Sequence, residues 1–503
     1  MLAIIHSATL LGIHGQPVIV EVHVSTGLPA FTIVGLPDEA CRESRDRVRA
    51  ALLSSGVKWP QQRITVNLAP SGVRKAGAGL DLAIAIGIVV AIGGLRPAQA
   101  EGYGFLGELG LDGSLRRVAG AVPLVDALGE VDCVVPAECT GEATLVARRS
   151  VRSAPNLAAV VAALAGDQPW PAPVCRASCS VAARQPDLAE VRGQAVARHA
   201  LAVAAAGGHH LLLVGPPGAG KTMLARRLPG LLPALSPRAA LEATVVHSAA
   251  GLALPQGLVI RPPLRAPHHT ASIVSLVGGG TAAMRPGEIS LAHGGVLFMD
   301  ELAEFPATVL DGLRQPLEEG VVRVTRARAT VEFPAHFLLV AAMNPCPCGG
   351  GGEPGGCACD ASVRTRYLRR VSGPLLDRFD LRVTVRRPSV EDLFDGAPAE
   401  STAAVAARVE AARRMSLARG FETNAAIPGE LLDEVAPLTP AAAAALRREL
   451  EAERLTGRGF HRVRRVARTV SDLRDGGFVV DEQDVRVALS LRVDLPRTVR
   501  SAA

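Results

Sequence analysis

The chain has 503 residues, a length that excludes a single small domain and predicts roughly two to four folded domains. Its residues are 48% hydrophobic and 20% charged, a composition that excludes a disordered chain. Its 54 basic and 48 acidic residues give a formal charge of +6, which permits an anionic partner without demanding one. Aromatic residues make up only 3%, which argues against a base-stacking platform for nucleic acid.

The first part of the chain, residues 1–166, alternates strand-like and helical stretches. The hydrophobic patterns predict strands over 18–24, 31–34 and 64–68 and helices over 38–55 and 79–92. The longest apolar run, Leu82–Leu95, is too short to cross a bilayer, and residues 1–12 lack the basic start of a secretory signal. We therefore expect a cytoplasmic protein with no membrane partner.

A proline-rich stretch predicts a linker over 167–187, followed by a second α/β block over 188–388. Short, fully apolar strands are typical of a parallel sheet covered on both faces. Such strands are predicted at Leu211–Val214, Val296–Met299 and Phe337–Ala342. The remainder, 389–503, is predicted to be helical, with helices over 403–419, 440–455 and 462–475.

The strongest motif is the run Gly215-Pro216-Pro217-Gly218-Ala219-Gly220-Lys221-Thr222, which follows a predicted strand and opens a predicted helix. This context is that of a P-loop, whose glycines let backbone N–H groups turn toward a phosphate. Lys221 would supply a positive charge to the β and γ phosphates, and the Thr222 hydroxyl would ligate Mg²⁺. The motif predicts ATP and Mg²⁺ as cofactors.

Two further strands end in polar residues that suit the same site. Asp300 and Glu301 close an apolar strand, where carboxylates are costly unless they serve a cation or a water molecule. Asp300 is predicted to hold Mg²⁺ and Glu301 to polarise the attacking water. Asn344 ends the third strand and could orient that water, although an asparagine before Pro345 is also typical of a plain turn.

Arginines beyond the sheet are candidates for stabilising transition-state charge. Arg378 lies at the end of the α/β block, where ring ATPases place a finger that enters a neighbour's site. Arg458 opens a predicted helix and is the candidate for a lid arginine on the same nucleotide, with Arg462 second. A weaker hypothesis places the segment Val191–Gln194 against the adenine. Because the chain is rich in arginine, a solvated surface charge is the alternative for each arginine.

Four cysteines form two closely spaced pairs, Cys346 with Cys348 and Cys357 with Cys359, in a glycine-rich loop. Four thiolates suit a tetrahedral, structural Zn²⁺ of about one ion per chain. The one-residue spacing is tighter than usual, so four reduced cysteines in an insert are the alternative. The scattered cysteines are interpreted as core residues: Cys41, Cys133, Cys139, Cys175 and Cys179.

Two basic features are candidates for DNA contact. Residues 320–333 are predicted to form a hairpin with Arg323, Arg326 and Arg328 near its tip, able to meet phosphates without sequence preference. Residues 265–269 and 278–280 form a second insertion. Solvated surface loops are the alternative for both. A helix over 461–474 could be basic on one face or could simply pack between domains.

Several segments together resemble the magnesium-chelatase-like AAA+ ATPases, most closely the YifB/ComM type, over nearly the whole chain. The resemblance is carried by 215–222, 265–269 (Arg-Ala-Pro-His-His), 285–290, 296–301, 341–349 (with Asn-Pro-Cys-Pro-Cys-Gly), 373–380 and 465–469. It implies an α/β protein made of an N-terminal Lon-protease-like (ribosomal S5 domain 2-like) domain, a P-loop AAA+ domain and a C-terminal helical lid.

The resemblance also implies a homo-hexameric ring that drives branch migration of recombination intermediates during natural transformation, with single-stranded or branched DNA as its partner. A Lon-type protease needs a Ser–Lys pair, but Ser71 and Lys75 are not expected to form one. The alternative function is a chaperone-like motor that remodels a protein partner, as magnesium-chelatase motor subunits do. Stimulation of ATP hydrolysis by DNA would separate the two.

Overall fold

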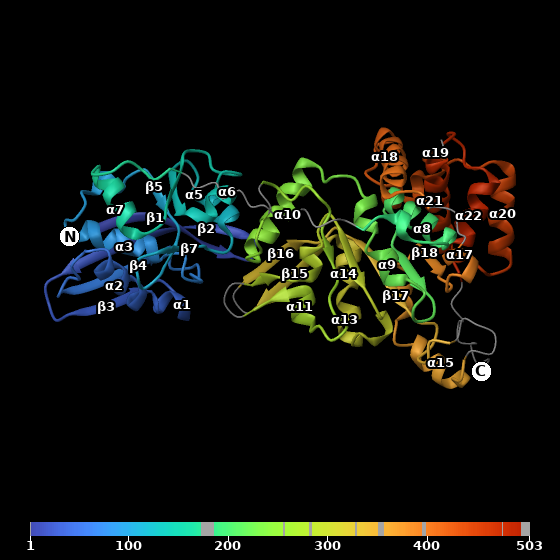
Figure 1. The fold of residues 1–503 in the computed structure, drawn as a ribbon, viewed down its shortest axis with the longest axis horizontal. Helices are drawn as coiled ribbons and strands as arrows, with labels where there is room; N and C mark the ends of the chain where they lie inside the picture. The colour runs from blue at the N-terminus through green and yellow to red at the C-terminus, as the bar shows by residue number, and fades with distance from the viewer. Residues whose placement is uncertain are drawn as a thin grey trace.

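The computed structural model describes residues 2–172, 186–254, 257–280, 284–326, 329–350, 357–394, 399–474 and 476–493. An N-terminal domain, a central sheet domain and a C-terminal group of helices follow one another along the long axis of the molecule (Figure 1). Among the described helices, none is long and apolar enough to cross a membrane.

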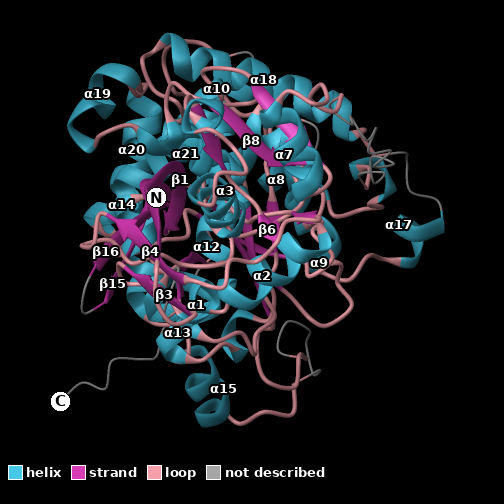
Figure 2. Ribbon diagram, turned by 90° about the vertical axis from the view of Figure 1, so that its left-hand side faces the viewer, coloured by secondary structure: helices cyan, strands magenta, loops and turns pink. Residues whose placement is uncertain are grey.

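The N-terminal domain is built on a seven-stranded mixed sheet in the order β3-β4-β2-β1-β5-β8-β9. Its strands are β1 Leu2–Leu11, β2 His14–Ser25, β3 Ala30–Val34, β4 Arg63–Ala69, β5 Tyr103–Phe105, β8 Asp132–Pro136 and β9 Val151–Ala154, with a small β6 Glu108–Leu109 and β7 Leu115–Arg116 pair. Its helices are α1 Glu39–Arg42, α2 Ser44–Ser54, α3 Asp81–Ala91, α4 Pro97–Ala100, α5 Ala121–Leu128, η1 Ala137–Cys139, α6 Thr140–Ala143 and α7 Leu157–Ala165. Helix α3 packs on β1 and β2 of this sheet, and Figure 2 views the molecule from this end.

The predicted elements of this domain are present, with two corrections. Residues 38–55 form two helices rather than one, because Asp38 caps a short α1 through the Cys41 N–H and the chain restarts as α2 at Ser44. Residues 2–11, where no strand was predicted, form strand β1, which pairs antiparallel with β2. Every residue of α3 is buried, as the apolar run predicted. Ser71 is exposed, whereas Lys75 is fully buried and donates to the Pro70 carbonyl.

The central domain contains a five-stranded sheet in the order β11-β14-β17-β10-β18, with every neighbouring pair parallel. Its strands are β10 Leu211–Val214, β11 Leu264–Arg265, β14 Val296–Met299, β17 Leu338–Met343 and β18 Leu381–Thr384. Two predicted strands match their bounds, and the third begins one residue later, at Leu338. Alternate residues of β10 and β14 belong to the hydrophobic cores on opposite faces of the sheet, which is why these strands are apolar throughout.

Helices and small strands surround this sheet. The helices are η2 Leu188–Glu190, α8 Ala195–Gly207, α9 Lys221–Ala225, η3 Leu228–Leu231, α10 Pro237–Ala249, α11 Ile273–Val277, α12 Glu288–Leu291, η4 Leu302–Glu304, α13 Ala307–Gly312, α14 Arg314–Glu319, α15 Ala361–Leu368, α16 Gly373–Leu376 and α17 Val390–Phe394. The small strands are β12 Gly278–Gly279, β13 Arg285–Pro286, β15 Val321–Arg326 and β16 Ala329–Pro334. The last two form the predicted hairpin, whose Val324 and Phe333 are buried.

The C-terminal helices are α18 Thr402–Ala418, η5 Asn424–Ala426, η6 Gly429–Leu431, α19 Leu432–Val435, α20 Pro440–Glu451, α21 Gly457–Leu473 and α22 Glu482–Ser490. Helix α21 begins earlier than predicted because Thr456 caps it through the Gly459 N–H. Arg464 and Arg468 of this helix are buried, and they pair with Asp433 and Asp472. The arginines of α21 therefore pack the domain together, and the hypothesis of a basic DNA-binding face on this helix is wrong.

The N-terminal and central domains meet at α5 and α10. Arg117 donates to the carbonyls of Gly251 (2.9 Å) and Leu252 (2.8 Å) and pairs with Glu142 at 2.6 Å. Glu142 also accepts from the Ser248 hydroxyl at 2.7 Å. One partly buried arginine thus joins the two domains through both backbone and carboxylate acceptors.

Arg117→Ala is expected to lower the free energy of unfolding by about 1–3 kcal/mol, because it leaves the buried Glu142 carboxylate short of a partner. Chemical denaturation followed by circular dichroism measures this loss. Arg148→Ala removes an exposed pair with Asp126 and is the control, with an expected change below about 0.5 kcal/mol. Equal losses in the two variants would contradict the bridging role of Arg117.

Candidate functional site

The candidate site lies where three neighbouring parallel strands end. Strands β14, β17 and β10 are adjacent, with Met299 aligned to Ala341 and Met343 aligned to Val214. Gly215, Asp300 and Asn344 follow these strands directly, so the sheet brings together three segments that are distant in sequence. The carboxyl edge of a parallel sheet is where open α/β domains bind their ligands.

The glycines of the loop after β10 each have a geometric reason. A side chain at Gly215 would place its Cβ 2.1 Å from the carbonyl oxygen of Val385, the residue after β18. Gly218 and Gly220 have φ angles of +78° and +86°, in the left-handed region that favours glycine. This backbone turns into α9 as a P-loop does.

Lys221 is buried at the centre of the site. Its ammonium donates to the carbonyls of Gly215 (2.6 Å) and Pro216 (2.9 Å) and to the Asn344 side-chain oxygen (3.0 Å). Burial lowers the pKa of Lys221, and Asp300 and Glu301 oppose that shift. A buried cation with neutral hydrogen-bond partners fits a polyanionic phosphate, whose charge would offset the burial.

The acidic strand end adjoins this lysine. Thr222 donates its hydroxyl hydrogen to Asp300 at 2.6 Å, which joins the two predicted Mg²⁺ ligands. Asp300 also accepts from the Glu301 N–H at 3.0 Å. Glu301 has a φ angle of +52°, an uncommon conformation for a residue with a side chain and one that is frequent at functional sites. Its side chain is 55% exposed, so water can reach the carboxylate.

Sequence reasoning missed the partner of Glu301. The Nδ1 atom of His269 lies 2.9 Å from Glu301 Oε2. His269 belongs to the Arg-Ala-Pro-His-His segment, which was interpreted as part of a basic insertion and of the family resemblance, with no role at the nucleotide site. The two residues are 32 positions apart in sequence, and only the pairing of β11 with β14 brings them together.

Gln194 lies beside the phosphate-binding loop. Its side-chain amide donates to the Ala219 carbonyl at 3.3 Å and to the Arg386 carbonyl. Its backbone is in the left-handed region, at φ +53°. Gln194 therefore ties the start of α8 to the loop and to the chain after β18, at the same edge of the sheet.

Arg378 lies at the opposite edge of the sheet. It precedes β18, whose first residue, Leu381, aligns with Leu211 at the start of β10. The length of β10, roughly 13 Å, therefore separates the level of Arg378 from that of the loop holding Lys221. Arg378 pairs with Glu318 in this structure. Burial lowers the pKa of Arg378, and the charges of Arg462, Arg458 and Arg314 lower it further.

The surroundings of Arg458 bear on its predicted lid role, which stays a prediction. Arg458 lies close enough to Arg378 to affect its pKa, and the guanidinium of Arg462 lies 3.7 Å from Asp380, beside the start of β18. Both arginines therefore lie at the amino edge of the sheet, away from Lys221 of the same chain. Helix α21 packs on α8 beside the amino ends of the strands, where Thr469 contacts His209 just before β10.

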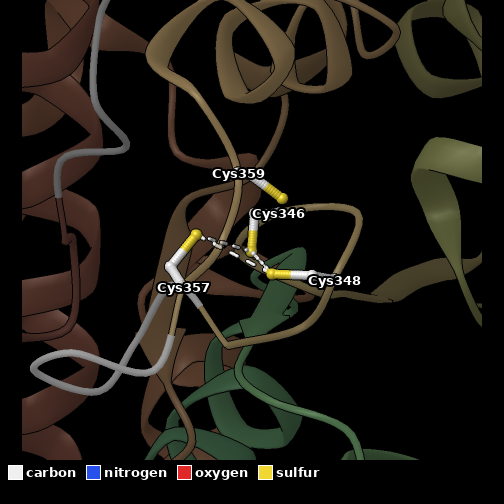
Figure 3. Close-up of side chains that lie close together, drawn as sticks. All are labelled: Cys346, Cys348, Cys357 and Cys359. Carbon is white, nitrogen blue, oxygen red and sulfur yellow. Dashed lines mark hydrogen bonds between the residues drawn. The ribbon is translucent and has the colours of Figure 1, made fainter.

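The four clustered cysteines converge, as Figure 3 shows. The Sγ atoms of Cys346 and Cys348 are 3.3 Å apart, and Cys357 lies 3.6 Å and 3.7 Å from them. With Cys359, all four sulfur atoms lie within 4.8 Å of one another. A tetrahedral metal with metal–sulfur bonds of about 2.3 Å separates its ligands by about 3.8 Å, so these four cysteines can hold a metal ion.

The cysteine cluster adjoins the phosphate-binding loop. Cys346 follows Asn344 by two residues, and a Cβ at Gly349 would lie 2.5 Å from Pro217 Cδ. The backbone N–H of Gly350, followed by the Cys346 thiol, lowers the pKa of the Cys348 thiol to about 6, which favours the thiolate form that binds metals. Cys41, Cys133 and Cys139 are buried, as expected of core residues, and Cys175 and Cys179 lie outside the described residues.

The DNA-contact candidates differ in their surroundings. Arg323 pairs with both Glu319 (2.6 Å) and Glu332 (2.7 Å), which neutralises much of its charge. Arg326 is exposed at the end of β15. Arg328 lies outside the described residues. Arg326 is therefore the described hairpin arginine best placed to meet a phosphate.

Three family models match the chain in order. "Subunit ChlI of Mg-chelatase" matches residues 20–138, "Magnesium chelatase, subunit ChlI" matches 187–393, and "Magnesium chelatase, subunit ChlI C-terminal" matches 399–492. The middle model covers the entire sheet domain with its nucleotide site, and the third covers the helical domain.

Relatives are similar over nearly the full length. YifB of Escherichia coli is 41% identical over 495 residues, covering 98% of this chain and 97% of that protein. The competence protein ComM of Haemophilus influenzae is 41% identical over 479 residues, covering 94% of each chain. A Mycobacterium tuberculosis protein is 44% identical over 494 residues, covering 97% of each chain.

Proposed function

Since the chain belongs to the magnesium-chelatase-like family of the YifB/ComM type, an AAA+ ATPase family, we propose that it is a ring-forming motor that uses ATP hydrolysis to remodel DNA. The observation that supports hydrolysis best is the convergence of Lys221, Thr222, Asp300 and Asn344 at one sheet edge, with Glu301 following Asp300. ATP supplies the transferable γ-phosphoryl group when bound, and Mg²⁺ neutralises its charge.

Each residue has a distinct part in this proposal. Lys221 and the loop amides bind the phosphates, and Thr222 with Asp300 holds the magnesium shell. Glu301 accepts a proton from the attacking water, and Asn344 orients that water. Asn344 already contacts Lys221, so its amide can respond when the lysine turns toward a phosphate.

A ring supplies what one chain lacks at its own site. Arg378 and Arg458 lie at the amino edge of the sheet, whereas Lys221 lies at the carboxyl edge. In a closed head-to-tail ring, the amino edge of one subunit would face the nucleotide of the next. We therefore assign Arg378 as the arginine finger and Arg458 as a second arginine acting on the neighbour's nucleotide. The proposed ring is a hexamer.

DNA is the proposed substrate, in the form of branched recombination intermediates moved by branch migration. One relative is named a competence protein, and Arg326 is exposed at the tip of the hairpin. Contacts of this kind bind the phosphate backbone by charge and carry no sequence preference. A motor that remodels a protein partner would share the ATP site, but it would not need the hairpin arginine.

Branched DNA is expected to stimulate ATP hydrolysis, and Glu301→Gln should lower hydrolysis at least about 100-fold while nucleotide binding persists. Arg326→Ala should weaken DNA binding and reduce the salt slope by about one. Coupled ATPase assays and fluorescence anisotropy measure these effects, with Glu304→Gln, a nearby exposed carboxylate paired with Arg370, as the control. Hydrolysis that ignores DNA and responds to a protein partner would favour the alternative motor.

Mixing two inactive variants tests the finger in the neighbouring site. Lys221→Ala and Arg378→Ala should each be inactive alone, whereas an equal mixture should regain hydrolysis at about a quarter of its interfaces, where an intact loop meets an intact arginine. Mixing Arg378→Ala with the Lys221→Ala/Arg378→Ala double variant is the control and should restore nothing. If the first mixture also stays inactive while both variants form mixed rings, Arg378 does not act across the interface.

We also propose that the four-cysteine cluster holds one structural zinc ion. The four sulfur ligands would fill a tetrahedral site and leave no open position for chemistry. Protein purified without chelators should contain about one zinc per chain by mass spectrometry, and Cys348→Ser should lose most of it. Cys133→Ala, which removes a thiol outside the cluster, should retain the metal. Wild-type protein without zinc would remove this proposal.

A further inference from the structure

His269 and Glu301 form a contact that the roles assigned above do not use. The histidine comes from the segment after β11, and the glutamate follows β14. We infer that His269 positions the Glu301 carboxylate for hydrolysis and links it to the insertion formed by residues 264–279. This inference rests on the proposed ATPase function, because it gives Glu301 the part of the base.

The contact determines which atom would donate. An ionised carboxylate only accepts, so a hydrogen bond across the 2.9 Å between Nδ1 of His269 and Oε2 of Glu301 places the hydrogen on Nδ1. The second oxygen of Glu301 is then left for the attacking water. A donor held against one oxygen limits the rotation of the carboxylate, and orientation of this kind is a major part of what a positioned base contributes.

The imidazole is itself held on two sides. The ring of His268 lies 4.1 Å from that of His269, centroid to centroid, and Phe305 meets it edge-on at 6.5 Å. His268 in turn contacts the Thr270 hydroxyl at 2.9 Å. The ring therefore has little freedom to leave the carboxylate while these neighbours keep their places.

Both ends of the contact are anchored by other elements. Arg265, four residues before His269, makes a bidentate pair with Glu288 of α12 at 2.6 Å and 2.8 Å. On the other side, the Glu301 N–H is bound by Asp300, which also contacts Thr222. The position of the base thus depends on the insertion as well as on the sheet.

The same insertion reaches the hairpin. Beyond His269 it continues through α11 to Gly279, where a Cβ would lie 3.1 Å from the guanidinium of Arg326. Helix α11 also packs on α13, with Ile273 against Gly312. One short segment therefore lies beside both the exposed hairpin arginine and the hydrolytic glutamate, and it is the route by which a phosphate bound by Arg326 would alter the orientation of Glu301.

Three substitutions at position 269 test the inference. His269→Ala should lower kcat at least about tenfold and leave the KM for ATP within about twofold, because the base loses its orientation while the phosphate contacts remain. Asparagine places its amide nitrogen near the position of Nδ1, so His269→Asn should recover much of kcat. Glutamine places its amide nearer to Nε2, so His269→Gln should not recover it.

DNA provides the second readout. In His269→Ala, branched DNA should bind with unchanged affinity but should no longer stimulate hydrolysis. Unchanged or raised kcat in this variant would overturn the inference, as would DNA stimulation equal to that of wild type. Loss of nucleotide binding or of thermal stability, or failure of asparagine to recover kcat, would assign His269 a structural role and also overturn it. Inactive wild-type protein would instead sink the proposed ATPase.

Discussion

The parallel pairing of β14, β17 and β10 is the constraint on which the site depends. Each of these strands is buried on both faces, and each gives way to a polar residue at its carboxyl end: Asp300, Asn344 or the loop from Gly215. The hydrogen bonds Thr222–Asp300 and Lys221–Asn344 can form only if the strands keep this order and register. Packing of the two apolar cores therefore fixes the polar geometry at their edge.

The opposite edge of the same sheet carries a different chemistry. Arg378 and Arg458 gather there with Arg462 and Asp380, beside helices that pack the C-terminal domain onto α8. Polar groups and cationic groups thus gather at opposite edges of one sheet. Under the proposed function, a subunit of this design would be complete only beside another copy.

Loops around the nucleotide site are held by contacts with more distant segments. The cysteine loop touches the phosphate-binding loop through Gly349 and Pro217, and the insertion after β11 touches Glu301 through His269. A bound metal would stiffen the first contact, and an occupied hairpin would act on the second. The nucleotide site can therefore be influenced from two sides without any change in the residues that hold the phosphates.

Local sequence determined much of this protein. Local sequence predicts the P-loop, the acidic strand end, Asn344 and the cysteine pairs, because residues close together in the chain supply the chemistry of each. It also predicts fully apolar strands and helices such as α3, because burial on all sides leaves a continuous apolar run. Only the tertiary structure decided which edge of the sheet holds Arg458, that Arg464 and Arg468 are buried, and that His269 meets Glu301. These three features depend on strand order and on helix packing between residues far apart in sequence. The residues around an arginine or a histidine in the chain do not indicate whether its side chain will be solvated, buried against a carboxylate or placed beside Glu301.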